Sequence, residues 1–190
     1  MRKEYIEGQK FNAENFSDKP LEKGDYESCT FSNCIFSNTD LSEFSFSDCL
    51  FEHCDLSMAQ LKETTFTDVK FKNCKLLGLH FDDCKRFNLS FDFENCVLNF
   101  SSFYRLKLKS IHFNTCKLEE VDFVQADLTN AVFKDCDLRM AVFENTILEG
   151  ADLRKAINFS IDPEANYINK AKFSTQNIAG LLHKYNLFIE

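Results

Sequence analysis

Residues 49–63 read CLFEH-CDLSM-AQLKE, three units of five in which a small residue comes first and a Phe or Leu comes third. Working outward in steps of five, the third position is always Phe, Leu or Tyr from Phe11 to Phe81, and again from Phe93 to Leu153. The step from Phe81 to Phe93 is twelve residues in place of ten, so the frame slips by two. A repeat this long arises by chance roughly once in a billion sequences, and it therefore decides the fold.

The nine cysteines all occupy the small position of this unit, two residues before a centre of the frame. A free cysteine packs as a small apolar side chain, so we expect buried, reduced cysteines. Disulfides or a metal site are the alternatives that so many cysteines raise. Cysteine side chains stacked in register point the same way, which is poor geometry for a disulfide. Neighbouring cysteines are five residues apart, whereas the paired cysteines of a zinc site of the ribbon type are separated by only two residues. We therefore predict no metal and no cofactor.

A period of five matches neither an α-helix nor a simple β-strand. The segments CDLSM (54–58), ADLTN (126–130) and CDLRM (136–140) resemble the pentapeptide-repeat family, and the resemblance extends over roughly residues 11–155. It implies an all-β fold, a right-handed quadrilateral β-helix with four pentapeptides in each coil. Cysteines 20 residues apart fit such stacking. In the second series Phe and Leu alternate, which would place Phe on two opposite faces.

The boundaries follow from where the repeat is regular. We expect an N-terminal cap and irregular first coil over 1–28, the β-helix over 29–157, and a loop, last repeat unit and C-terminal helix or tail over 158–190. The frame slip falls at 84–92. A strictly regular frame would bury Arg86, which is costly for an unpaired charge, so we expect Phe87 to enter the core and two residues to bulge. The bulge is either a packing irregularity or a contact point for a partner.

Composition excludes several classes of function. Acidic residues outnumber basic ones by 30 to 22, which argues against direct binding of nucleic acid through a basic surface. No apolar run is long enough to span a bilayer, and residues 1–10 lack the apolar region of a secretory signal, so we expect a cytoplasmic location. The sequence has no HExxH, nucleophile-elbow or phosphate-loop motif, so we expect no enzymatic activity.

Negative charge is concentrated on two of the four expected faces over residues 9–83. The Leu41 face is centred on Leu21, Leu41, Leu61 and Phe81, and the Phe46 face on Tyr26, Phe46 and Phe66. Together they carry ten acids and two bases, whereas the Phe31 face, centred on Phe11, Phe31, Phe51 and Phe71, carries more bases than acids. The candidate acidic binding residues are Asp25, Glu27, Asp40, Glu43, Asp48, Glu63, Asp68, Asp82 and Asp83.

This one-sided charge has two interpretations. An acidic surface keeps a protein soluble and need not bind anything. A narrow rod with an acidic flank also imitates duplex DNA, because electrostatic steering and counterion release reward an ordered row of negative charge in a basic cleft.

The C-terminal segment carries an apolar stripe at helical spacing. Ser174 or Thr175 can begin a short α-helix, which would cap the last coil. The tail beyond that helix is more apolar than a cap needs, so we interpret it as part of a two-fold interface. The residues expected to cap the rod or form this interface are Ile178, Leu181, Leu182, Tyr185, Leu187, Phe188 and Ile189.

Two short segments narrow the resemblance to the quinolone-resistance (Qnr-type) branch: 179–185 with the apolar tail, and 54–59. This branch implies a homodimer joined at its C-terminal ends, whose acidic rod occupies the DNA site of DNA gyrase or topoisomerase IV and protects it from quinolones. The best-known members carry longer projecting loops, where this sequence has only its two-residue slip. A β-helical scaffold for another protein partner and an enzyme or metal protein that uses the cysteines remain alternatives.

Overall fold

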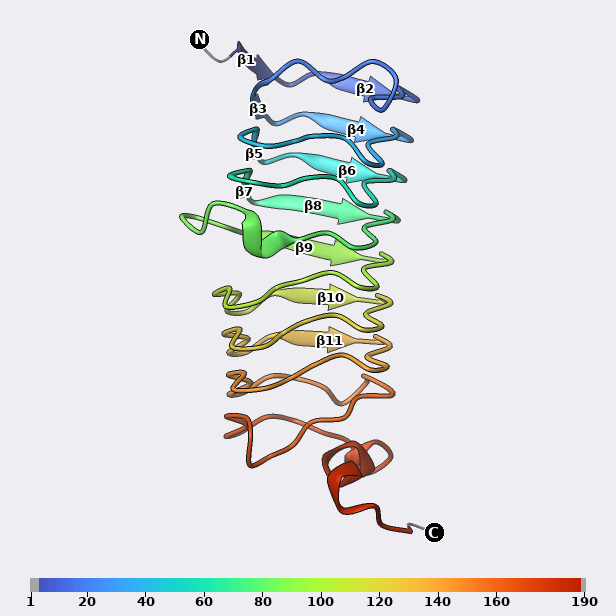
Figure 1. Ribbon diagram of the computed structural model, residues 1–190, viewed down its shortest axis with the longest axis vertical. Helices are drawn as coiled ribbons and strands as arrows, with labels where there is room; N and C mark the ends of the chain where they lie inside the picture. The colour runs from blue at the N-terminus through green and yellow to red at the C-terminus, as the bar shows by residue number, and fades with distance from the viewer. Residues whose placement is uncertain (1–3, 189–190) are drawn as a thin grey trace.

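The computed structural model describes residues 4–188, which form a straight rod of stacked four-sided coils (Figure 1). Every strand pair in this part of the chain is parallel and joins one coil to the next. Strand β1 lies at one end of the rod and the C-terminal helical segment at the other (Figure 1). The expected all-β quadrilateral β-helix is therefore confirmed.

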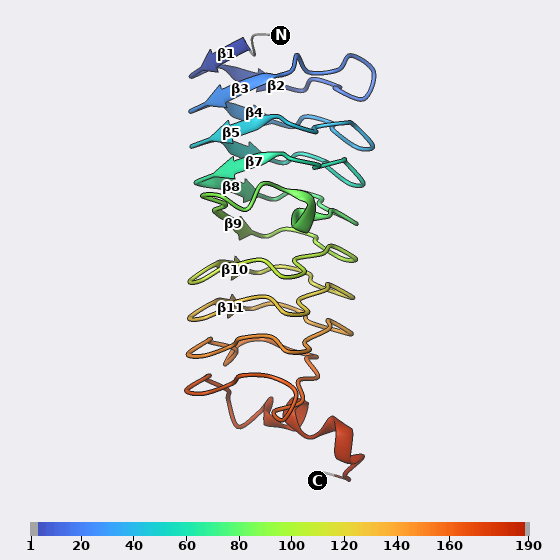
Figure 2. The same cartoon turned by 60° about the vertical axis from the view of Figure 1, so that its left-hand side comes forward.

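Two faces of the rod carry the strands, and Figure 2 shows both in one view. The Phe46 face is a four-stranded sheet in the order β1 (Glu4–Glu7), β3 (Gly24–Glu27), β5 (Ser45–Ser47) and β7 (Thr65–Thr67). The Phe31 face is a seven-stranded sheet in the order β2 (Lys10–Asn12), β4 (Thr30–Ser32), β6 (Leu50–Glu52), β8 (Val69–Lys72), β9 (Phe91–Glu94), β10 (His112–Asn114) and β11 (Val132–Lys134). Partners are 20 residues apart, except that Phe71 pairs with Phe93 across the slip.

The other two faces are joined by isolated bridges. On the Leu41 face these bridges include Asp40 to Gln60 and His80 to Ser102. We name the remaining face the Leu56 face after its central residue. A series of bridges joins its successive coils, the first between Asn15 and Ile35 and the last between Asp137 and Ile157. Five residues per side with one bridge are enough to hold one coil against the next.

Most corners of the rod are turned by a residue in the left-handed region, two positions after a centre. The φ angles of Asn33, Glu63 and Phe100 are 54°, 58° and 64°. This conformation costs a residue other than glycine roughly 1–2 kcal/mol. Most corner N–H groups donate to a carbonyl of the next coil, as Asn33 does to Glu52 at 2.9 Å, and these hydrogen bonds offset the cost. The corner side chains stand at the edges of the rod, available to solvent.

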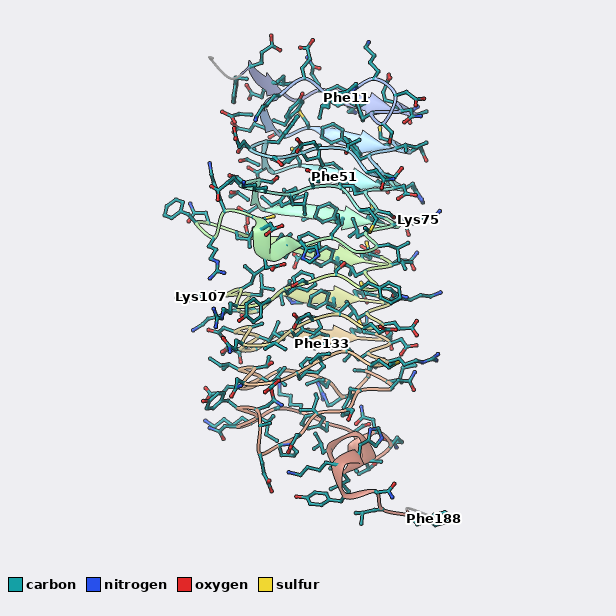
Figure 3. The ribbon with its side chains drawn as sticks, in the orientation of Figure 1. Phe11, Phe51, Lys75, Lys107, Phe133 and Phe188 are labelled. Carbon is teal, nitrogen blue, oxygen red and sulfur yellow. The ribbon has the colours of Figure 1, made fainter. Side chains whose placement is uncertain are left out.

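The core consists of stacked aromatic rings. The ring centroids of Phe113 and Phe133 are 5.1 Å apart with an interplanar angle of 9°, and Phe113 meets Phe123 of the opposite face edge-on at 78°. Figure 3 shows Phe51 and Phe133 inside the rod. These contacts confirm the expected placement of Phe on two opposite faces of the second half. Offset stacks and edge contacts are also the arrangements that aromatic rings prefer.

All nine cysteines are buried thiols, as predicted. Six of them form one continuous column behind the Leu56 face, which crosses the slip without a break: Cys34, Cys54, Cys74, Cys96, Cys116 and Cys136. Each thiol donates to backbone carbonyls, as Cys74 does to Phe51 at 3.3 Å. Burial raises the pKa of the Cys49 thiol to about 12, which keeps it protonated and unreactive at neutral pH.

The prediction for the frame slip was wrong for Phe87. Its side chain is 80% exposed at the tip of a loop, residues 85–90, that projects from the rod beside β7 (Figure 1). Leu89 packs against the core in its place. The loop is anchored where Lys85 N–H donates to Thr64 and Ser90 N–H donates to Phe66. With two extra residues between fixed anchors, the chain must leave the coil, and Arg86 and Phe87 leave with it.

The N-terminal end joins the β-helix earlier than expected. Strand β1 pairs with β3, and Ile6 lies in register with Tyr26, so the repeat begins one unit before Phe11. Irregularity is confined to the side of this first coil where Lys19 N–H donates to Asn15 in a turn. Ile6 thus takes the inward position that Phe, Leu or Tyr takes in the later units, and the sequence pattern of those three residue types does not include it.

The C-terminal segment is helical but forms two 3-10 helices, η2 (Ile178–Leu181) and η3 (His183–Tyr185), instead of the expected α-helix. Gly180 is buried directly against the Phe159 ring, with no room for a β-carbon. The Asn177 side chain donates to the carbonyls of Leu153 and Ala156 at 2.8 and 2.9 Å. These contacts with the last coil fix a tighter turn than an α-helix allows. No helix in residues 4–188 is long and apolar enough to cross a membrane.

Candidate functional site

The corner between the Leu41 and Phe46 faces carries a column of three acidic residues. Glu43 and Glu63 occupy the same corner position in successive coils, and Asp83 follows in the next coil, shifted by one residue at the end of the short helix η1 (Phe81–Asp83). The Glu43 N–H donates to Lys62 and the Glu63 N–H to Asp83, both at 2.9 Å. The backbone therefore fixes the spacing of these carboxylates, and we name this set the first acidic column.

A second acidic column, Asp48 and Asp68, runs along the other corner of the Phe46 face. Asp48 N–H donates to Thr67 of the next coil at 2.9 Å. Asp68 is held by Ser90, whose hydroxyl lies 2.7 Å from its N–H and 2.9 Å from its carboxylate. Between the columns, β5 and β7 present only small hydroxyl side chains: Ser45, Ser47, Thr65 and Thr67. The result is a flat face with carboxylates along both edges.

Asp25 and Glu27 extend this acidic face on β3, one coil nearer the N-terminus. Glu27 accepts a hydrogen bond from the Tyr5 hydroxyl at 2.6 Å, and this bond raises the pKa of Tyr5 to about 12. The structure therefore brings seven of the nine predicted acids onto one flat face and its two corners.

The other two predicted acids, Asp40 and Asp82, lie on the Leu41 face; Asp40 is exposed and Asp82 is partly buried. Asp40 accepts hydrogen bonds from Ser42, which lower the pKa of its carboxyl. Asp82 belongs to η1 (Phe81–Asp83), where its carboxylate is only 20% exposed and lies 3.4 Å from the His80 ring nitrogen. A short helix follows the His80 bridge in place of the usual turn, and the Asp82 carboxylate is partly buried there.

Counter-charges on the acidic columns are few. Lys23 forms an ion pair with Glu43 at 2.8 Å. Within residues 4–188, Asp48, Glu63 and Asp83 have no ion-pair partner. Carboxylates held in register without a neutralising cation create a strong local negative potential.

The acidic columns end at loop 85–90, where the sign of the charge reverses. Five cations lie on or directly below this loop: Lys85, Arg86, Arg105, Lys107 and Lys109. Sequence reasoning missed this cluster because charge was sorted only as far as residue 83. Continuing the assignment of residues to faces across the slip, with one step of 22 in place of 20, would have placed Lys107 and Lys109 on the Phe46 face next to the loop.

The second predicted site, at the C-terminal end, is partly packed and partly exposed. Leu181 packs against the core, and Leu182 is half-buried. The exposed fractions of Leu187 and Phe188 are 58% and 94%, and Figure 3 shows Phe188 pointing away from the last coil. Ile178 and Tyr185 are also about half exposed. Ile189 lies outside the described residues.

Ion pairs between side chains, as well as packing, hold this C-terminal end to the rod. The Lys184 ammonium lies 2.7 Å from both Asp162 and Glu164. Its presence lowers the pKa of each carboxyl and raises that of Lys184 itself. Tyr185 donates to Glu164 at 3.2 Å, which holds η3 beside the last coil.

The part of the chain that the structure describes contains no group of three or more His, Cys, Asp or Glu side chains placed to hold a metal ion. The acids of the two columns are spread one to a coil along the rod. Such an arrangement suits binding to an extended charged surface better than coordination of one ion.

Comparison with known proteins identifies the repeat. A family profile described as "Pentapeptide repeat region" matches residues 25–103 and 89–159. No curated protein sequence matches the chain. Two solved structures of trypsin-treated QnrB1, described as a plasmid-mediated fluoroquinolone resistance protein, share the fold. The first has 16% sequence identity and a TM-score of 0.75, and the match covers 98% of this chain and 92% of that chain. The second has 17% sequence identity and a TM-score of 0.63, and the match covers 99% of this chain and 98% of that chain. The chain therefore belongs to the pentapeptide-repeat family, with a β-helix that resembles QnrB1.

Proposed function

We propose that this protein is a non-enzymatic DNA mimic that binds a type II topoisomerase, DNA gyrase or topoisomerase IV, in the cytoplasm. The observation that carries the proposal is the pair of acidic columns flanking the flat Phe46 face. Each column places one carboxylate per coil, about 4.8 Å along the rod. Two columns together give one charge per roughly 2.4 Å, which is close to the one charge per about 1.7 Å of duplex DNA.

Mimicry of this kind needs order more than total charge. Free acidic side chains on a flexible surface lose entropy when they bind, whereas the backbone of Glu43, Glu63 and Asp48 is already fixed by hydrogen bonds to the next coil. A basic cleft that binds duplex DNA would meet carboxylates at regular intervals on a rod of narrow cross-section. The topoisomerase would then be occupied without a nucleic-acid substrate.

The choice of a type II topoisomerase as the partner is supported by the resemblance of this chain to QnrB1. QnrB1 is described as a fluoroquinolone resistance protein, and fluoroquinolones act on type II topoisomerases. The C-terminal segment 179–185 also resembles the Qnr-type branch. We infer that protection from quinolones follows if the rod displaces the DNA on which the drug acts.

The proposed assembly is a homodimer through the C-terminal ends. Phe188 and Leu187 are the most exposed apolar side chains of the last helical turn and tail. Large apolar groups at the end of a rod are unfavourable in water, and pairing with a second copy about a two-fold axis would bury them. The dimer would place two acidic rods end to end.

A β-helical scaffold for another protein is the second candidate. It is favoured by the cationic cluster at loop 85–90, which interrupts the acidic surface and limits any imitation of DNA to the N-terminal half. Such a scaffold would bind a partner through shape and local charge without affecting topoisomerases.

The experiment that separates the two is supercoiling by purified DNA gyrase, with this protein titrated in and a quinolone present or absent. Rescue of the drugged enzyme, or inhibition of the undrugged enzyme that weakens with added salt, is the expected result. No effect at micromolar protein would contradict topoisomerase binding and leave the scaffold.

A further inference from the structure

The five cations beside the projecting loop form one patch, which we name the loop patch: Lys85, Arg86, Arg105, Lys107 and Lys109. Lys85 stands where the loop leaves the rod, since its N–H donates to Thr64, and Lys107 lines the pocket under Leu89 and Ser90, where the loop returns. Figure 3 shows Lys107 pointing outward on the side from which the loop projects. The patch therefore continues the acidic side of the rod with the opposite charge.

The charges of the loop patch are poorly neutralised. Lys109 lies 3.4 Å from Asp127. Within residues 4–188, Lys85, Arg86 and Lys107 have no ion-pair partner. Cations without an ion-pair partner on one side of the rod attract an anion supplied from outside the chain.

The geometry also provides a place for an acidic side chain. A pocket of about 190 Å³ opens below the loop, and its lining includes Lys70, Lys107 and Lys109 with two acids, Asp68 and Asp92. The Asp68 carboxylate already accepts a hydrogen bond from the Ser90 hydroxyl. Lys109 is paired with Asp127, but Lys70 and Lys107 have no ion-pair partner within residues 4–188, and their two ammonium groups can hold one carboxylate from a partner.

Phe87 supplies an apolar anchor next to these charges. Its ring is 80% exposed, although the loop on which it stands is tied to the rod at Lys85 and Ser90. A fully exposed Phe on an anchored loop gains nothing for the fold. An aromatic anchor inside a charged rim is the usual anatomy of the energetic centre of a protein–protein interface.

We propose that the loop patch, with Phe87 at its centre, is a second binding surface, which takes an acidic protein surface bearing an apolar pocket. Nucleic acid fits less well for two reasons. A polyanion longer than the patch would run into Glu63 and Asp83 in the adjacent coils. Proteins that bind single strands stack several bases on aromatic rings, whereas here the other nearby ring, Tyr104, is half-buried and covered by Arg105 at 4.7 Å.

The inference goes beyond the proposed function, because it holds whichever protein the rod binds. A partner that engages both surfaces must carry a basic region next to an acidic one. A partner with a uniformly basic cleft would engage the acidic columns and be repelled by the loop patch. The reversal of charge along one side of the rod thus sets the orientation in which a partner can dock.

The test uses fluorescence anisotropy at low salt with a labelled peptide of glutamates around a central leucine, and with a labelled poly(dT) oligonucleotide of equal charge. The whole protein is acidic, so binding of an acidic peptide must come from a local patch. Lys85→Glu with Lys107→Glu is expected to weaken peptide binding roughly tenfold, and Phe87→Ser several-fold. The matched control, Lys117→Glu with Lys134→Glu, changes net charge equally at exposed positions on other faces and is expected to bind like the wild type.

Three outcomes would overturn the proposal. The first is no peptide binding by the wild type, the second an equal loss in the control variant, and the third tighter binding of the oligonucleotide than of the peptide. Because the probe is a peptide, these outcomes are independent of whether the acidic columns bind a topoisomerase.

Discussion

The backbone N–H of Glu63 donates to the carbonyl oxygen of Asp83 at 2.9 Å, which ties two acidic residues of adjacent coils to each other. Like charges repel by about 1 kcal/mol in water when they are about 4 Å apart, and by less at the distance between coils. The fold thus holds an arrangement that opposes its own stability. A basic partner surface would turn this repulsion into attraction, and this is the physical basis of the proposed function.

Reversing these two charges tests the acidic columns. The change Glu63→Lys with Asp83→Lys is expected to abolish any effect on gyrase supercoiling while leaving thermal stability nearly unchanged, because both residues are exposed and two lysines repel each other about as two carboxylates do. The control, Glu120→Lys with Asp135→Lys, alters two corner acids on other faces by the same net charge. Equal loss of effect in the control would show that only net charge matters.

The aromatic stacks should dominate stability. Phe113→Ala removes a ring that stacks on Phe93 and Phe133 and is expected to cost about 3–5 kcal/mol of unfolding free energy, measured by urea titration. Phe87→Ala provides the comparison, since that ring is exposed and its loss should change stability by less than about 0.5 kcal/mol. A similar cost for the two variants would contradict the assignment of core and loop.

The contact between Gly180 and Phe159 should control docking of the C-terminal segment. A methyl group at Gly180 would collide with the Phe159 ring, so Gly180→Ala is expected to displace η2 without unfolding the coils. Hydrogen exchange gives the readout, because the Ile161 N–H donates to the Gly180 carbonyl at 3.0 Å. Faster exchange at Ile161 with unchanged exchange at Phe113 is predicted; unchanged exchange at both would refute the docking.

Lys184 should make the stability of this end depend on pH. Its ion pairs lower the pKa of Asp162 and Glu164 below their ordinary values near 4. A lowered carboxyl pKa contributes stability that is present above the ordinary value and is lost as pH falls through the lowered one. We expect the melting temperature of the wild type to fall below about pH 4 more steeply than that of Lys184→Met. Parallel curves would exclude this role, and added salt should reduce the difference.

Self-association should depend on the apolar tail. Leu187→Ser with Phe188→Ser is expected to convert a dimer to a monomer in sedimentation velocity, because both side chains are more than half exposed within one chain. Met58→Ser with Met140→Ser removes two exposed apolar side chains elsewhere and should leave the dimer intact. A monomeric wild type would contradict the proposed two-fold interface.

The repeat of five predicted most of the fold because each inward residue could be counted. The centres from Phe11 to Phe81, the cysteine column and the alternation of Phe and Leu all lie where their spacing placed them. Corner geometry was not predictable from residue type, since Glu63, Met58 and Phe100 adopt a conformation usually left to glycine. Stacking hydrogen bonds between coils, which no local pattern reveals, overrule that preference.

The two failures share a cause. Phe87 was placed in the core by its apolar character, but the anchors at Thr64 and Phe66 leave no room for two extra residues within the coil. The α-helix over Ile178–Tyr185 was predicted from spacing, but the close approach of Gly180 to Phe159 dictates tighter turns. In both places a contact distant in sequence decided the local structure.

Competition with DNA tests the central claim most directly. Labelled protein would be bound to DNA gyrase, and unlabelled duplex DNA titrated in while anisotropy is recorded at several salt concentrations. The account predicts that DNA displaces the protein and that affinity falls steeply with salt. Gyrase that binds DNA and this protein at the same time, or that does not bind the protein at all, would contradict it.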